Sequence, residues 1–194
     1  MQRSPDDIQD ELLVLRCQSG DGEALKALVF RWHPRLRRLA GRLTDGDAAS
    51  DVVQDSWLAI VRGLRRLDDP TRFRVWAYRI VRNKCADWNR RRATRRVAML
   101  KLQAGAIGCS KNDEQTSLEN ADEVRRMRAA LRRLPDDERA MLSLHSIGGL
   151  SVLEIAAVFS LPTGTVKSRL YGARERLRKA IEVRNHERTG NENS

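Results

Sequence analysis

The sequence predicts an all-α protein built from two small helical domains. Helix-forming residues are abundant in all parts of the 194-residue chain, and apolar residues recur every three or four positions over long stretches. No segment shows the sustained alternation of apolar and polar residues that is typical of a strand. Residues 103–123 interrupt the helical pattern because they are small and polar, with five acidic residues against one basic residue. We therefore expect domains at 1–95 and 123–185, joined by a flexible acidic linker at 96–122.

The first domain is expected to contain four helices. Their apolar spacing places them at about Asp6–Gln18, Gly22–Leu43, Ala48–Leu67 and from Phe73 through Arg92. Pro34 lies inside the second segment, where it is expected to bend the helix or to mark a break between two helices. Together these segments carry enough amphipathic surface to close one core.

The second domain is predicted to end in a helix-turn-helix. Ser151 and Glu154 form an S-x-x-E capping box that starts a helix at about Val152. The segment 160–164 (Ser-Leu-Pro-Thr-Gly) interrupts that helix, and a second helix is expected to run to about Ile181. Its apolar residues lie on one helical face, spaced by 4, 3, 4 and 4 residues: Val166, Leu170, Ala173, Leu177 and Ile181. The last residues, 186–194, are expected to form a disordered tail.

The opposite face of the last helix is small and polar, with cations at its edges. It carries Lys167, Ser168, Tyr171 and Gly172, flanked by Arg169 and Arg174. Such a face suits a helix that lies in the major groove of DNA, where a small residue permits close approach and cations bind phosphate. An ordinary helical hairpin with a solvated polar face would show the same pattern, so this motif alone leaves both interpretations open.

The positive charge is concentrated in one segment. The chain carries 37 basic and 26 acidic residues, a net charge of +11, and residues 62–101 alone hold 14 basic and 3 acidic side chains. Concentrated charge of this kind favours binding to nucleic-acid phosphates, although a solvated face or a disordered arm can also carry it. Aromatic side chains that could stack on unpaired bases are interleaved with the cations. Phe73 and Trp76 share a core-facing stripe, whereas Tyr78 lies off that stripe.

Several classes of protein and site are not expected. No apolar run approaches the roughly 20 residues that span a bilayer, and the N-terminus lacks the apolar segment of a secretory signal. We therefore predict a cytoplasmic protein without membrane insertion. The three cysteines, Cys17, Cys85 and Cys109, are far apart, and no cysteine or histidine pair has the spacing of zinc ligands. No metal or cofactor is predicted.

Five motifs in order give the chain its resemblance to a known family. They lie at 24–43, 51–58, 73–83, 134–139 and 162–177. Residues 51–58 (DVVQDSWL) resemble D-[LV]-V-Q-[DE]-x-[FW]-[LI], and residues 73–83 (FRVWAYRIVRN) resemble F-x-x-W-L-Y-R-I-A-x-N. The last range resembles P-x-G-T-V-K-S-R-[IL] followed by A-R-E-x-L. With a further match at Gly149–Ser151, the pattern is similar to that of an extracytoplasmic-function (ECF) sigma factor of bacterial RNA polymerase.

The resemblance implies a division of labour. Residues 1–95 would be sigma region 2, which docks on core RNA polymerase and captures and melts the −10 element, and residues 123–185 would be region 4, which binds the −35 duplex. The implied core-docking residues, which would meet the clamp helices of the largest polymerase subunit, are Asp51, Gln54 and Asp55. The implied −10 DNA-binding residues are Arg72, Arg79, Asn83 and Lys84. The implied −35 DNA-binding residues are Thr165, Lys167, Ser168, Arg169, Tyr171 and Arg174. The second polymerase subunit would contribute its flap.

The resemblance has a departure and leaves some questions open. Asp68-Asp69-Pro70 puts two negative charges and a rigid residue in the base-capture loop, so the preferred −10 base cannot be carried over. An anti-sigma protein would suit exposed apolar residues, but core packing would explain the same residues.

Two alternatives come from other classes of protein. A stand-alone helix-turn-helix regulator with a sensing or dimerising N-terminal half explains residues 120–185 equally well, but not the concentrated charge. A metal-dependent nuclease would use clustered carboxylates at Asp45, Asp47, Asp51 and Asp55, but no His or Glu pattern completes such a site. We therefore expect a transcription factor and not an enzyme.

Overall fold

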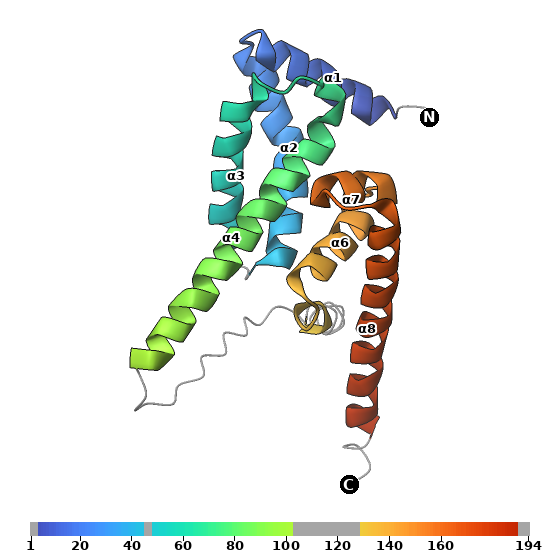
Figure 1. Cartoon of the computed structure of the whole chain (residues 1–194). Helices are drawn as coiled ribbons and strands as arrows, with labels where there is room; N and C mark the ends of the chain where they lie inside the picture. Colours follow the sequence, from blue (N-terminus) through green and yellow to red (C-terminus); the bar gives the residue numbers. More distant parts are fainter. Residues whose placement is uncertain (1–3, 45–47, 103–128, 190–194) are drawn as a thin grey trace.

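A computed structural model describes residues 4–44, 48–102 and 129–189 of the chain. The described part is helical, and no strand occurs in it. The N-terminal domain consists of α1 (Pro5–Gln18), α2 (Gly22–Leu43), α3 (Ala48–Leu64), the short 3-10 helix η1 (Pro70–Arg72) and α4 (Phe73–Leu102). Figure 1 shows α2, α3 and α4 side by side, with α1 lying across one end of them.

Local capping explains where the first two helices begin. Ser4 and Asp7 form a reciprocal capping box at the start of α1, where each side chain accepts a hydrogen bond from the other residue's backbone N–H. Asp21 is the N-cap of α2, and its carboxylate accepts from the backbone N–H groups of Glu23 and Ala24. These bonds and that of the Arg16 guanidinium hold the pKa of Asp21 below its ordinary value.

Of the two alternatives expected at Pro34, a bend or a break, the break is wrong, because α2 runs as one helix from Gly22 to Leu43. Its buried face supplies the centre of the core, where the Trp32 ring meets the rings of Phe73 and Tyr78 edge-on at centroid distances of 5.3 and 5.5 Å. Tyr78 is therefore buried, only 2% exposed. The expectation that it lies off the core stripe and offers a stacking surface is corrected by this packing.

Two helix ends also differ from the predicted ones. The helix α3 ends at Leu64, three residues earlier than expected. The helix α4 continues to Leu102 and so covers the first seven residues of the predicted linker. Its last part is rich in arginine, which is a good helix former, so no signal stops the helix at 95. The acidic stretch at 103–123 lies outside the described residues.

The C-terminal domain contains a helical stretch at 129–132, then α6 (Asp136–Ser146), α7 (Val152–Phe159) and α8 (Thr163–Thr189). The predicted capping box is present, because Ser151 accepts from the Glu154 N–H while Glu154 accepts from the Ser151 N–H. Ser160 ends α7 in the left-handed conformation, with φ of 54°. This turn sends the chain into α8, which continues four residues into the segment expected to be a disordered tail.

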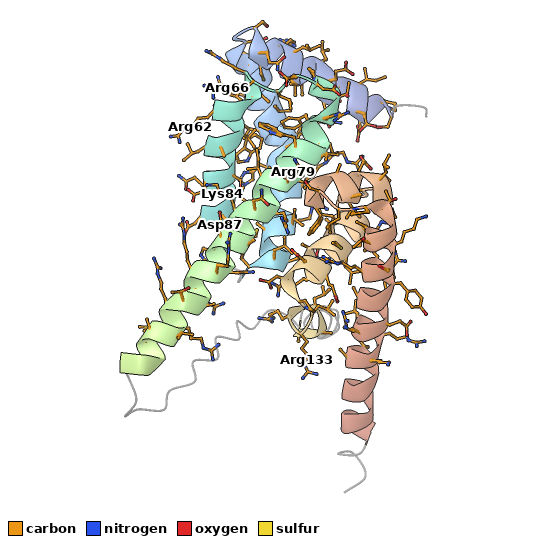
Figure 2. The ribbon with its side chains drawn as sticks, in the orientation of Figure 1. Arg62, Arg66, Arg79, Lys84, Asp87 and Arg133 are labelled. Atoms are coloured by element: carbon orange, nitrogen blue, oxygen red, sulfur yellow. The ribbon has the colours of Figure 1, made fainter. Side chains whose placement is uncertain are left out.

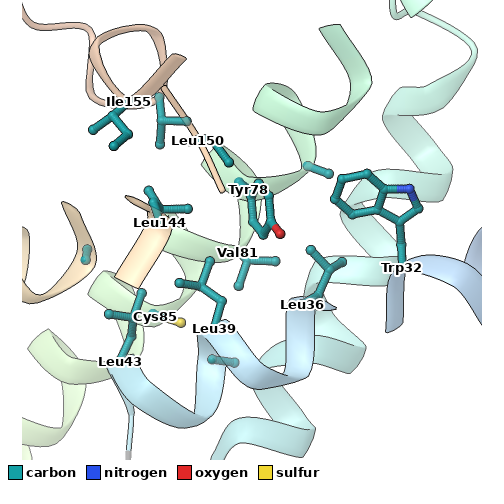
Figure 3. Packing of buried hydrophobic residues seen from close by; sticks show 14 of the residues in the cluster. Trp32, Leu36, Leu39, Leu43, Tyr78, Val81, Cys85, Leu144, Leu150 and Ile155 are labelled. Atoms are coloured by element: carbon teal, nitrogen blue, oxygen red, sulfur yellow. The ribbon is translucent and has the colours of Figure 1, made fainter. Parts of the chain in front are cut away.

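The two domains pack against each other through α2 and α4 on one side and α6 and α7 on the other. Figure 3 shows Leu144, Leu150 and Ile155 of the C-terminal domain beside Tyr78 and Val81 of the N-terminal domain. The buried residues of both domains belong to one apolar cluster.

A polar contact accompanies this apolar packing at the end of α2. The backbone carbonyl of Leu43 accepts hydrogen bonds from Asn89 and Arg139 at 3.1 Å each. It is thereby bound from both domains, since Asn89 lies on α4 and Arg139 on α6.

Candidate nucleic-acid and polymerase interfaces

The predicted DNA-facing side of α8 is exposed. Val166, Leu170 and Ala173 are buried against the rest of the C-terminal domain, as their spacing predicts. The opposite side is open to solvent and presents Lys167, Ser168, Arg169, Tyr171 and Arg174. We call this set of residues, with Gly172, the α8 face.

The side chains at the centre of the α8 face are short. A methyl group added at Gly172 would have no atom within 4 Å, and the Ser168 hydroxyl is turned inward, donating to the Thr165 carbonyl at 3.0 Å. Thr165 itself is only partly exposed. Tyr171 stands out from the face and is 70% exposed. A helix with this profile can approach a groove floor closely at Ser168 and Gly172 while longer side chains reach to either side.

A second exposed face lies on α3. Asp51, Gln54 and Asp55 are exposed, while Trp57 and Leu64 are buried on the opposite side of the helix. This arrangement matches the predicted separation of polar and apolar sides.

The α3 face also has an apolar part, which was not predicted from the sequence. Leu58 and Val61 are 51% and 43% exposed, and they continue the row of Asp51, Gln54 and Asp55 by helical spacing. Val61 is one of the apolar residues by which this helix is predicted, yet its side chain lies outside the core. The α3 face therefore combines acidic and amide groups with exposed aliphatic side chains, as protein–protein contact surfaces do.

The predicted −10 residues do not form one open surface on α4. Arg72 is exposed and pairs with Asp69 in the preceding loop at 3.0 Å. Asn83 is exposed and accepts a hydrogen bond from Arg82 at 3.0 Å, and Lys84 is partly exposed. Arg79, by contrast, forms hydrogen bonds with the C-terminal domain.

The contacts of Arg79 are made at the end of α7. Its guanidinium donates to the backbone carbonyls of Ala157 and Val158, and to the Ser160 hydroxyl at 2.8 Å. Figure 2 places Arg79 on the side of α4 that faces α7, whereas Arg62 and Arg66 lie on the far side of the N-terminal domain.

Two further arginines of α4, which no sequence signal had singled out, also bind the C-terminal domain. Arg74 donates to the Gly148 and Gly149 carbonyls at 2.7 and 2.6 Å. Arg82 pairs with Asp137 at 2.6 Å and stacks over the Phe159 ring, with its guanidinium carbon 4.4 Å from the ring centroid. We call Arg74, Arg79 and Arg82 the α4 arginine row. Nothing in their sequence context distinguishes them from the other cations of residues 62–101.

Comparisons with known families divide the chain in the same way as the motifs. Residues 28–95 match the Sigma-70 region 2 family, and residues 125–177 match the Sigma-70 region 4 family. The ECF RNA polymerase sigma-E factor of Salmonella typhimurium strain LT2 is 32% identical over 179 residues, an alignment that covers 88% of this chain and 93% of the relative. The sigma-E factor of Escherichia coli K12 is 31% identical over the same length.

The chain belongs to the ECF family of RNA polymerase sigma factors. As such it directs promoter-specific initiation of transcription by RNA polymerase, and the stand-alone regulator is not favoured. Sigma factors are DNA-binding initiation factors without enzymatic activity, which agrees with the expectation of a transcription factor. The predicted fold class, all-α with a region 2 domain and a region 4 domain, is confirmed by the structure and by these matches.

Two solved structures share the fold of this ECF sigma factor. CnrH in complex with the cytosolic domain of CnrY aligns with a TM-score of 0.69 and 29% identity, covering 90% of this chain and 98% of CnrH. The sigma factor RpoE of Bartonella quintana, solved with the anti-sigma factor NepR, aligns with a TM-score of 0.65 and 25% identity, covering 82% and 97%.

Other classes of site are not evident in the described part of the sigma factor. Its residues include no group of three or more His, Cys, Asp or Glu side chains placed to hold a metal ion. None of the described helices is long and apolar enough to cross a membrane. Cys17 and Cys85 are buried free thiols, and burial raises the pKa of Cys85 to about 12.

Proposed function

We propose that the three sets of residues predicted from the sequence divide the work of initiation among α3, α4 and α8. The α3 face docks on core polymerase, the basic helix α4 captures the −10 element, and the α8 face binds the −35 duplex. The observation that carries this proposal is the separation of the three surfaces. The α3 face and the α8 face are exposed sides of two separate helices, and the −10 residues lie on α4 and at the end of η1 before it.

The proposed role of the α3 face rests on its mixed character. Asp51, Gln54 and Asp55 offer acceptors and an amide, and Leu58 and Val61 add apolar area beside them. We propose that this face binds the clamp helices of the largest polymerase subunit, and that the C-terminal domain contacts the flap of the second subunit.

The proposed roles of α4 and α8 rest on charge and on shape. Arg72, Arg79 and Lys84 supply cations for phosphates of the −10 strands, and Asn83 can donate to and accept from an unpaired base edge. On α8, Ser168 and Gly172 permit close approach to the groove, while the cations and Tyr171 reach its walls. Thr165 lies one turn ahead of Arg169 on the same helix.

The experiment that tests the docking role is a double substitution on α3. We expect Gln54→Ala with Asp55→Ala to weaken binding to core polymerase in a pull-down and to lower run-off transcription. Both side chains are exposed, so the free energy of unfolding should change by about 0.5 kcal/mol or less. The control is Glu23→Ala, which removes one exposed carboxylate from α2 of the same domain. Core affinity that is unchanged in the folded double variant would overturn the docking role.

Two further proposals concern the setting of the protein. We propose that it acts in the cytoplasm, where RNA polymerase and promoter DNA are found, without entering a membrane. We also propose that an anti-sigma protein binds it, because NepR is the anti-sigma factor in the complex with the related RpoE. Co-purification of such a protein with the tagged chain from its own cells would test the second proposal.

A further inference from the structure

Two members of the α4 arginine row, Arg74 and Arg79, bind the C-terminal domain mainly through backbone oxygens, whereas Arg82 binds the Asp137 carboxylate and the Phe159 ring. Arg74 contacts the carbonyls of the turn between α6 and α7, and Arg79 contacts the carbonyls that end α7. The last carbonyls of a helix have no partner within the helix and carry the negative end of its dipole. Arginine forms its strongest hydrogen bonds with anionic or partly anionic oxygens.

A nucleic-acid phosphate would form the same kind of hydrogen bond with these arginine side chains. A phosphate presents oxygens with negative charge to a guanidinium, as the end of α7 does with partial charge. Arg79 cannot serve both partners at once, because its Nη2 already contacts the Ala157 carbonyl and the Ser160 hydroxyl. The packing of α7 on α4 also places the C-terminal domain directly over this side of the helix.

From this competition, and on the basis of the −10 role proposed above for α4, we propose that the free sigma factor is held closed by its own C-terminal domain. The end of α7 and the α6–α7 turn occupy the α4 arginine row in place of nucleic-acid phosphate. Capture of the −10 strand then requires the C-terminal domain to leave α4, while the α8 face stays exposed throughout.

The buried thiol of Cys85 can report when the C-terminal domain leaves α4. Cys85 is 1% exposed, and it lines a small cavity together with Leu43, Asp136, Arg139 and Ala140. Four of the eight other residues that line this cavity belong to α6 (Asp136, Asp137, Arg139 and Ala140), so departure of the C-terminal domain should uncover the thiol. Cys17 is buried within the N-terminal domain on α1, so its reactivity reports unfolding of that domain instead.

The test is site-resolved thiol labelling of the full chain, with peptide mass mapping to follow Cys85 and Cys17 separately. Asp137→Arg places a cation against Arg82 at a position where the carboxylate is half-exposed. We expect it to raise the labelling rate of Cys85 about tenfold relative to that of Cys17, because like charges now face each other across the interface. In the wild type, raising NaCl from about 0.1 to about 0.5 M should also increase the rate, because salt screens the ion pair.

The matched control is Glu175→Arg. It makes the same change of charge in the same domain, but Glu175 pairs only with Arg178 of its own helix in the described structure. The labelling rate of Cys85 should stay at the wild-type value. If Asp137→Arg fails to fold, as judged by its helical circular dichroism, Asp137→Ala removes the same ion pair and should raise the rate to a smaller extent.

A second arm separates this proposal from the proposed function. We expect a mixed-sequence single-stranded oligonucleotide to bind Asp137→Arg more tightly than the wild type, and to accelerate Cys85 labelling in the wild type. If Cys85 is labelled no faster in Asp137→Arg than in Glu175→Arg, the closed state is overturned whatever the oligonucleotide does. If Asp137→Arg opens and yet binds the oligonucleotide no better, the closed state stands and the −10 role of α4 is overturned.

Discussion

The helices α4 and α8 are both long and basic, yet they differ in what covers their charged sides. On α8 the buried residues Val166, Leu170 and Ala173 lie on one side, so the cations and the small residues of the α8 face remain open to solvent. On α4, one side packs into the core of its own domain and an adjacent side receives α7, so three arginines are bound within the molecule. Positive charge in a sequence therefore does not by itself mark a free surface.

The largest expected effect concerns the open helix. Ser168→Leu puts a bulky side chain at the centre of the α8 face and should prevent close approach to the groove. Keeping the helix out of the groove removes several base contacts at once, each worth about 1–3 kcal/mol, so −35-dependent transcription should fall by more than about 150-fold in run-off assays. Binding to core polymerase and thermal stability should be unchanged, because Ser168 is exposed. Wild-type transcription from these promoters would show that Ser168 does not face DNA.

A smaller effect is expected for the exposed amide of α4. Asn83→Ala should still permit assembly on the promoter, but discrimination at one −10 base should fall by about 1–3 kcal/mol, or roughly 5- to 150-fold. A panel of promoters with every base at each −10 position measures this. A wild-type order of preference across the panel would mean that Asn83 does not contact a base.

The two helices can be compared directly by removing one arginine from each. Arg174→Ala should weaken binding to all −35-dependent promoters to a similar extent and lower the salt slope by about 0.9, the value for one phosphate contact. Arg79→Ala should do the same at the −10 element, but it should also speed up Cys85 labelling, because Arg79 binds α7. If Cys85 is labelled at the same rate in both variants, Arg79 does not hold α7 in place, and the proposed difference between the two helices is wrong.

The smallest effect concerns the loop before α4. Asp69 accepts from the Thr71 hydroxyl and backbone N–H, and these bonds, with the nearby Arg72 cation, hold the Asp69 pKa below its ordinary 3.8. A lowered carboxyl pKa stabilises the folded loop at every pH above the ordinary value, and this stabilisation is lost as the pH falls toward the lowered pKa. NMR titration should therefore find Asp69 ionised throughout the neutral range, with a midpoint below 3.8. A midpoint above it would contradict the loop geometry.

Much of the fold follows from local signals in the sequence. The apolar spacing of α2 and α3, and the capping box at Ser151, predict elements that the structure contains. The exposed sides of α3 and α8 follow as well, because each of these helices is covered from one direction only. Helical periodicity predicts which side is apolar, and the other side is then free.

The rest depends on contacts between segments far apart in the chain. Tyr78 is buried because Trp32 of α2 meets its ring and the C-terminal domain lies beside it, neither of which the spacing within α4 reveals. Arg79 is bound because the end of α7, about 80 residues away, presents carbonyl oxygens to it. Backbone acceptors have no residue signature, so no sequence pattern announces such a contact.

The partners of Arg74 and Arg79 have a consequence for how this protein tolerates mutation. The oxygens that they bind at Gly148, Gly149, Ala157 and Val158 belong to the main chain. A side-chain substitution at these positions that preserves the helix and the turn leaves the acceptors in place. Heritable change in these carbonyl contacts is therefore directed mainly to Arg74 and Arg79 themselves. Since we assign the same helix to the promoter, substitutions of these two arginines that loosen the domain contact would also weaken DNA binding, whereas a substitution of a partner side chain such as Asp137 would loosen the contact without removing a DNA-binding cation.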